Sequence, residues 1–244
     1  MREALLGLLS AVRFLTVLPV PGPETDLTRR HSYVWFPVVG LGLGVVSGGA
    51  FALGHLAAPV SAVAAVVALA ALTGALHLDG LADCADSLGA HDREKRLAVM
   101  RDSRLGTFGA VALVGVLLAK AAALWQAAPA DALRWLVTAG ALSRSAPLVL
   151  AASSAYARRE GIGVTFVAGV GPAVATLAAL VSTIVAALTV GPASALAATG
   201  VAVVVVAVIR WWANARLGGL TGDVMGASVE LTEVSVLCVC ALWR

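Results

Sequence analysis

The chain has 244 residues, of which 60% are apolar and 13% charged, and its mean hydropathy is +0.93. A soluble domain averages roughly 45–50% apolar and about 25% charged residues, so the composition excludes a soluble fold, a disordered chain, a collagen and a disulfide scaffold. The net charge of +3 is too small to indicate nucleic-acid binding. Lipid must therefore surround most of the chain.

The N-terminal segment, residues 1–18, predicts an amphipathic helix at the membrane interface. Arg2, Glu3 and Arg13 interrupt a leucine-rich stretch, and a proline-rich turn at 19–23 follows. A secretory signal peptide would end in a small-residue cleavage site in place of this turn. We therefore expect an interfacial helix.

Long uncharged runs predict about seven transmembrane helices. Residues 34–76 carry no Asp, Glu, Lys or Arg, and they are long enough for two spans of about 20 residues each. Gly54, His55 and Pro59 mark the expected break between these two spans. The five other spans are expected at 105–128, 132–155, 172–190, 192–212 and 224–243. The expected fold is all-α and polytopic, in a single domain over residues 1–244.

Basic residues divide the connections between these spans into two sets. Nearly all Lys and Arg lie in or beside the N-terminus and residues 77–104, 156–171 and 210–223, whereas the turns of the other set carry none. By the positive-inside rule the first set is cytoplasmic. We therefore expect the motif segments, 77–104 and 216–230, to face the cytoplasm.

Residues 77–104 contain six of the 14 acidic residues. Asp79, Asp83 and Asp86 stand at i, i+4 and i+7, so on a helix they span only about 60° of one face. Three stacked carboxylates repel one another unless a cation neutralises them. Mg²⁺ prefers oxygen ligands and is commonly held by carboxylates together with substrate phosphates. The spacing therefore favours a magnesium site over a solvated helix face, and over zinc, although His77 and Cys84 lie nearby.

Two further segments complete the expected cytoplasmic site. Arg101 and Arg104 flank Asp102 and match phosphate oxygens in geometry and charge, although they are also typical of residues that anchor a span. Before the last span, a turn with four glycines in residues 218–227 exposes backbone amides that suit a phosphate. The residues of this turn that we single out are Gly219, Thr221, Gly222 and Asp223, of which Asp223 adds an acid for a metal or for a substrate hydroxyl.

Charged residues also occur within the expected spans. Lys120, Arg144 and Glu230 are costly to bury in lipid and should face the bundle interior or a water-filled cavity. We expect them to contribute to substrate binding, and a structural ion pair is the alternative for Lys120. A transporter would place its polar groups near the membrane midplane. The acidic residues here gather at one rim instead, which favours an enzyme.

Three motifs, in order and spacing, closely resemble the cobalamin synthase family. They are HLDGLADCADSLGA at 77–90, MRDSRLGTFG at 100–109 and GGLTGDVMGASVELTE at 218–233. The likeness extends to LLSAVRFLTVLPVP near the N-terminus and to YARREG in the middle, so it covers essentially the whole chain. The resemblance implies an inner-membrane adenosylcobinamide-GDP ribazoletransferase that requires Mg²⁺ and acts in the last steps of vitamin B12 assembly.

The resemblance also implies a reaction and a set of roles. The 3′-hydroxyl of α-ribazole, or of its 5′-phosphate, would attack the cobinamide-side phosphate of adenosylcobinamide-GDP and displace GMP. The four aspartates at 79, 83, 86 and 223 would hold the metal, Arg101 and Arg104 would stabilise the phosphates, and Asp102 would be a second-rank catalytic candidate. His77 would assist proton transfer.

Two other membrane enzyme classes remain alternatives on the residues alone. CDP-alcohol phosphotransferases share Asp79 and Gly80 of their motif with this chain, but the match stops there. Intramembrane prenyltransferases use an aspartate pair spaced like Asp79 and Asp83, but a second such motif is absent from the sequence. Lipid and the two substrates are the expected partners, and the sequence leaves homo-oligomerisation open.

Overall fold

A computed structural model describes residues 2–22, 25–53, 57–158 and 162–243 of the chain. Within these ranges every regular element is a helix, and the only β-type pairing is an isolated bridge between Tyr156 and Leu220. The predicted all-α fold is therefore confirmed. The expected break at Gly54 and His55 lies outside the described residues.

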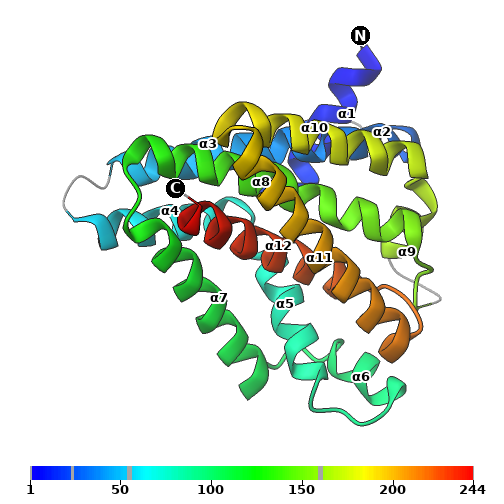
Figure 1. Ribbon diagram of the computed structural model, residues 1–244. Helices are drawn as coiled ribbons and strands as arrows, with labels where there is room; N and C mark the ends of the chain where they lie inside the picture. The colour runs from blue at the N-terminus through cyan, green and yellow to red at the C-terminus, as the bar shows by residue number, and fades with distance from the viewer. Residues whose placement is uncertain (1, 23–24, 54–56, 159–161, 244) are drawn as a thin grey trace.

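The helices pack into one bundle, from which the first half of α1 projects (Figure 1). Within the described ranges, six helices are long and apolar enough to cross a membrane, and a bent pair supplies a seventh if it counts as one span. The chain order is α1 (Arg2–Leu15), α2 (Asp26–Ser32), the 3-10 helix η1 (Tyr33–Trp35), α3 (Phe36–Leu53), α4 (Ala58–Leu72), α5 (Leu76–Ser87), α6 (Arg93–Val99), α7 (Thr107–Trp125), α8 (Pro129–Ser153), α9 (Ile162–Gly169), α10 (Pro172–Val190), α11 (Pro192–Leu217) and α12 (Gly222–Leu242).

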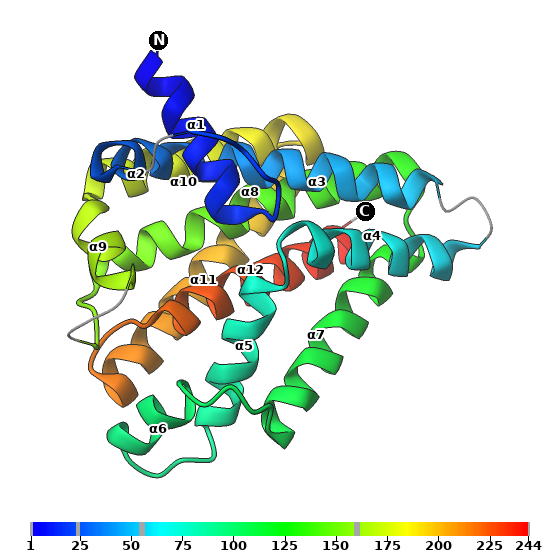
Figure 2. The ribbon, with the colours of Figure 1, turned by 180° about the vertical axis from the view of Figure 1, so that it is seen from behind.

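The second predicted span differs from a straight helix. Helix α4 ends at Leu72 after 15 residues, and the chain turns by 92° into α5. Gly74 and Ala75 make the turn with φ angles of +59° and +56°. This left-handed conformation suits glycine but costs alanine roughly 1 kcal/mol, so the surrounding packing must hold Ala75 in place. The bend directs the acidic helix α5 away from α4 (Figure 2).

Helices α8 and α12 are the most buried of the six long apolar helices. Helix α8 packs against α3, α10 and α12. It approaches α3 so closely that a Cβ atom on Gly40 would collide with the carbonyl of Gly140, and one on Gly44 would collide with that of Leu136. Small residues at a helix contact allow this approach in a membrane, where packing replaces the hydrophobic effect as the cohesive force. The central helices therefore form a rigid frame for the site.

Helix α1 packs on α2 and α3 instead of lying apart from the bundle. A Cβ on Gly7 would meet the backbone of His31, and Ala11 and Leu15 are buried. The amphipathic helix expected at residues 1–18 is therefore present from Arg2 to Leu15. Its C-terminal turn brings Phe14 and Leu15 into the wall of a cavity.

Candidate active site

A cavity of about 250 Å³ opens where α1, α3, α5, α8, α9 and α12 meet. Four of the residues singled out in the sequence line it: His77, Asp79, Gly222 and Asp223. The remaining lining residues are mostly apolar or glycine: Phe14, Leu15, Phe36, Leu76, Gly80, Pro147, Gly163, Phe166, Met225, Gly226 and Val229. The cavity therefore has a polar end formed by α5 and α12 and an extensive apolar wall.

Glycines beside the aspartates bring α5 and α12 together. A Cβ on Gly80 would lie 2.8 Å from the carbonyl oxygen of Asp223 and 3.2 Å from the Cα of Gly226. This close backbone approach is open only to glycine. Gly80 follows Asp79 directly, and Gly226 lies one helical turn after Asp223. The contact between the two helices therefore brings the carboxylates of Asp79 and Asp223 to the wall of the same cavity.

Three helices begin at this cavity. Leu76 and His77 open α5, Gly163 lies in the first turn of α9, and Gly222 and Asp223 open α12. The N-terminus of a helix carries a partial positive charge and backbone amides that attract anions. The cavity is therefore suited to a phosphate group held between helix ends.

The carboxylates of this region form a single electrostatic group. Asp83 experiences repulsion from Asp79, Asp86 and Asp223, and attraction from Arg158. The Nη2 group of Arg158 donates a hydrogen bond to Oδ2 of Asp223 at 2.9 Å. Among the described residues, one arginine thus partly offsets four acidic side chains, and the excess negative charge of this set is what a cation would neutralise.

Asp86 turns toward the start of α7. Its Oδ2 accepts a hydrogen bond from the amide of Gly106, and its Oδ1 accepts one from the amide of Gly109, each at 2.8 Å. A Cβ on either glycine would collide with the Asp86 carboxylate. Asp86 therefore caps α7 from another helix, which the shared helix face of the three aspartates did not indicate.

Two substitutions of Asp86 distinguish a role in capping α7 from a role in binding the metal. We expect Asp86→Ala to lower the free energy of unfolding by about 1–2 kcal/mol, because two helix amides lose their acceptor. Asp86→Asn should lose less stability than Asp86→Ala and keep most of the activity, because its one amide oxygen still accepts from one of the two amides, while its NH2 group faces the other. Unfolding in mixed micelles and an activity assay measure both. An inactive but stable Asp86→Asn protein would instead identify Asp86 as a metal ligand.

The arginine segment before α7 lies on the surface. Arg101 and Arg104 are exposed, and neither lines the cavity. Arg104 donates hydrogen bonds to Asp102 from Nε and, at 2.6 Å, from Nη2. These bonds lower the pKa of Asp102 to about 2. The structure thus pairs Asp102 with Arg104 outside the cavity, and a catalytic role for the three residues stays a prediction.

The glycine-rich segment divides into two parts. Thr221 is fully buried and caps α12 by accepting a hydrogen bond from the amide of Val224 at 3.2 Å. Gly219 packs against the backbone at Ala155, where a side chain would collide. Only Gly222 faces open space, since an added Cβ there would meet no atom within 4 Å. Gly222 therefore contributes cavity surface, whereas Gly219 and Thr221 shape the turn.

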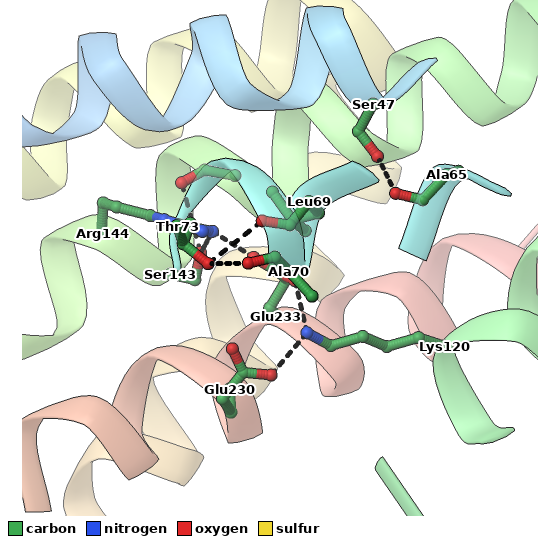
Figure 3. A network of polar contacts seen from close by, with 11 residues as sticks. Ser47, Ala65, Leu69, Ala70, Thr73, Lys120, Ser143, Arg144, Glu230 and Glu233 are labelled. Carbon is green, nitrogen blue, oxygen red and sulfur yellow. Dashed lines mark hydrogen bonds and ion pairs between the residues drawn. The ribbon is translucent and has the colours of Figure 1, made fainter. Parts of the chain in front are cut away.

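The charged residues inside the spans form a buried network between α7, α8 and α12 (Figure 3). The Nζ group of Lys120 donates to Glu230 at 2.6 Å and to Glu233 at 2.5 Å. Arg144 donates to the other oxygen of Glu233 and to Ser143. None of these residues lines the cavity. The ion-pair alternative for Lys120 describes this arrangement, and substrate binding by Lys120, Arg144 and Glu230 stays a prediction.

His77 lies between this network and the cavity. It lines the cavity, it is 5% exposed, and its Nδ1 has no hydrogen-bond partner among the described residues. The charges of Arg144, Glu233 and Lys120 all act on its ring. In the Nε2–H tautomer the Nδ1 atom carries a lone pair that can accept a proton.

Comparison with known proteins identifies the family. Residues 7–241 match the sequence profile described as cobalamin-5-phosphate synthase. The chain belongs to the cobalamin-5-phosphate synthase family. Similar proteins named adenosylcobinamide-GDP ribazoletransferase occur in Chlorobaculum parvum (42% identity over 98% of this chain and 96% of the relative), Chlorobaculum tepidum (39%, over 98% and 96%) and Klebsiella pneumoniae (36%, over 93% and 96%). No solved structure matches the chain.

These matches confirm the resemblance to the cobalamin synthase family and the enzyme class that the motifs predicted. They span almost the whole chain, so they include α1 and α9 as well as the three motif segments. In this member of the cobalamin-5-phosphate synthase family, the first motif forms α5, the second ends in the first turn of α7, and the third forms the turn into α12.

Sequence reasoning missed two features of this cobalamin-5-phosphate synthase family site. Arg158 pairs with Asp223, and neither the resemblance of its segment, YARREG, nor its charge indicated that partner. Phe14, Phe36 and Phe166 come together in the cavity wall from α1, α3 and α9. Phenylalanine in a membrane helix usually indicates only contact with lipid. The one sequence feature that could have indicated this cluster is the small number of phenylalanines, five in the chain.

The donor set at the polar end fits Mg²⁺. Among the described residues no three His, Cys, Asp or Glu side chains form a ready-made metal cluster. Mg²⁺ does not require one, because it usually binds one or two carboxylates and completes its shell with water and substrate phosphates. Asp79 and Asp223, with Asp83 beside them, supply carboxylate oxygens of that kind next to three helix N-termini.

Proposed function

We propose that this protein transfers the phospho-adenosylcobinamide group of adenosylcobinamide-GDP to α-ribazole or its 5′-phosphate, with Mg²⁺ as cofactor. The observation that carries the proposal is the cavity that combines Asp79 and Asp223 with the N-termini of α5, α9 and α12. A pyrophosphate and its metal require that combination of carboxylates and anion-binding helix ends. The full-length family match favours this reaction over those of CDP-alcohol phosphotransferases and prenyltransferases.

In the proposed reaction one P–O bond forms and another breaks. The ribose 3′-oxygen bonds to the cobinamide-side phosphorus, and the bridging P–O bond breaks so that GMP leaves with the electron pair. When bound, Mg²⁺ would neutralise charge on the phosphate oxygens and on the departing GMP. Asp79, Asp83 and Asp223 would hold this ion.

Protein groups would orient the substrates and accept the proton. The helix N-termini would orient the phosphates with their amides and dipoles. The hydroxyl proton must leave the attacking oxygen, and His77, which lines the cavity, would assist this proton transfer. Arg158 would keep the Asp223 carboxylate oriented through their ion pair.

We propose that the site faces the cytoplasm from the inner membrane. In both ribbon views the α7–α8 turn and the C-terminus lie at one end of the bundle, while α6 and α9 lie at the other (Figures 1 and 2). Helix α6 and the loop after it carry Arg93, Lys95, Arg96, Arg101 and Arg104. By the positive-inside rule that end is cytoplasmic.

Release of GMP tests the function. The full-length protein in lipid nanodiscs would receive adenosylcobinamide-GDP and α-ribazole 5′-phosphate, with Mg²⁺ or with EDTA. We expect GMP and a corrinoid that carries the ribazole in equal amounts with Mg²⁺, and neither product with EDTA. GMP without the new corrinoid would indicate hydrolysis. Folded protein that released no GMP would refute the proposed reaction.

A further inference from the structure

Aromatic residues are concentrated at the cavity. Three of the five phenylalanines in the chain, Phe14, Phe36 and Phe166, line it. We call these three residues the aromatic wall. The rings of Phe14 and Phe36 are nearly parallel, with centroids 5.6 Å apart, and those of Phe14 and Phe166 are 6.2 Å apart. Tyr33 packs edge-on against Phe166 behind them.

The three rings differ in exposure. Phe36 and Phe166 are buried, at 1% and 5% exposed, whereas Phe14 is 45% exposed. Phe14 also borders a second cavity, of about 340 Å³, which shares Leu76 and Phe166 with the first. Two buried rings therefore pack against a third, more exposed ring that borders both cavities. This is the arrangement of a stacking platform for a planar ligand.

We propose that the aromatic wall binds the flat base of the ribazole acceptor and that Phe14 is the residue that stacks on it. This inference rests on the proposed function, because it assigns a place to one of the two substrates of that reaction. The base would lie against Phe14, and the sugar would extend toward the carboxylates of Asp79 and Asp223 at the polar end of the same cavity.

The size and chemistry of the cavity distinguish the acceptor from the donor. A volume of about 250 Å³ accommodates a base with its sugar but not a corrin ring, which is several-fold larger. Guanine carries donors and acceptors along its edge that need partners once they are buried. Among the described lining residues, only His77, Asp79 and Asp223 have side chains that bear such a group. A benzimidazole base, which is mostly apolar, matches this wall.

Steady-state kinetics of full-length Phe14 variants test the assignment. We expect Phe14→Ala to raise the KM for α-ribazole about tenfold, within the range measured for loss of base stacking. The KM for adenosylcobinamide-GDP should stay within about twofold, because the donor does not contact the wall. Phe14→Tyr should restore the acceptor KM, since it keeps the ring. Leu5→Ala, at an apolar position on α1 that is somewhat more exposed than Phe14, should change neither constant.

A binding measurement that needs no turnover separates this inference from the proposed function. Equilibrium dialysis of α-ribazole alone should show weaker binding to Phe14→Ala and Phe14→Leu than to the wild type. If ribazole binding depends on Phe14 but no GMP is released, the proposed reaction fails and the aromatic site stands. If GMP is released and Phe14→Ala leaves ribazole binding unchanged, the inference fails alone. A selective rise in the donor KM would also overturn it, because guanine would then occupy the wall.

Discussion

Replacing Glu233 by glutamine is expected to lower the free energy of unfolding by about 3–5 kcal/mol, the cost of breaking a buried ion pair by removing one partner. Glu233 accepts from both Lys120 and Arg144, and all three side chains are at most 4% exposed. The network balances two positive charges with Glu230 and Glu233. Glutamine preserves the shape but leaves one buried positive charge unpaired.

The charge balance itself can be tested with a compensated variant. Lys120→Met combined with Glu230→Gln, made in the wild-type protein, removes one charge of each sign and leaves Arg144 paired with Glu233. We therefore expect this double variant to be much more stable than Glu233→Gln. Arg134→Gln breaks only an exposed pair with Asp131 and should change stability by less than about 0.5 kcal/mol. Fluorescence-detected unfolding in mixed micelles measures all three. A double variant less stable than Glu233→Gln would contradict a role based on charge balance.

The second large effect is expected on activity. Asp79→Asn and Asp223→Asn should each lower kcat/KM by about 10²–10³, because the metal and phosphates lose an oriented charge in a dry site. Both carboxylates line the cavity, and neither lies in the membrane network. The Mg²⁺ concentration that gives half the maximal rate should rise in both variants. GMP release as a function of Mg²⁺ provides both values.

The control for these variants lies at the opposite end of α8. Asp131 is an exposed carboxylate in the first turn of that helix, far from the cavity lining. Asp131→Asn should therefore keep its rate and its Mg²⁺ dependence. If Asp79→Asn kept the wild-type rate and the same Mg²⁺ requirement, Asp79 would not be a metal ligand, even if the overall reaction were demonstrated.

The helices were predictable because lipid makes apolar run length directly informative. The fifth expected span, 172–190, coincides with α10, and the seventh, 224–243, differs from α12 by only one or two residues at each end. The bend before α5 was not predictable in this way. It depends on a left-handed alanine at 75, and nothing in that residue type indicates a positive φ.

The sequence predicted where the charged residues lie better than it predicted which residues they pair with. Periodicity placed Asp79, Asp83 and Asp86 on one helix face, and α5 bears this out. It did not show that the start of α7 meets that face at Asp86 but not at Asp79. In the same way, the cost of intramembrane charge placed Lys120 and Arg144 in the interior, yet only the packing of α7 and α8 on α12 selects Glu233 as their common acceptor.

The short helix α4 has a consequence for the surrounding lipid. Its 15 residues extend only about 22 Å, whereas the hydrocarbon core of a bilayer is about 30 Å thick. The long helices α8 and α11, with 25 and 26 residues, exceed that thickness. The hydrophobic height of the protein therefore varies around its circumference. We expect acyl chains beside α4 to shorten or tilt to match it, so that the bilayer is thinner where α5 begins and a water-soluble nucleotide meets less hydrocarbon there.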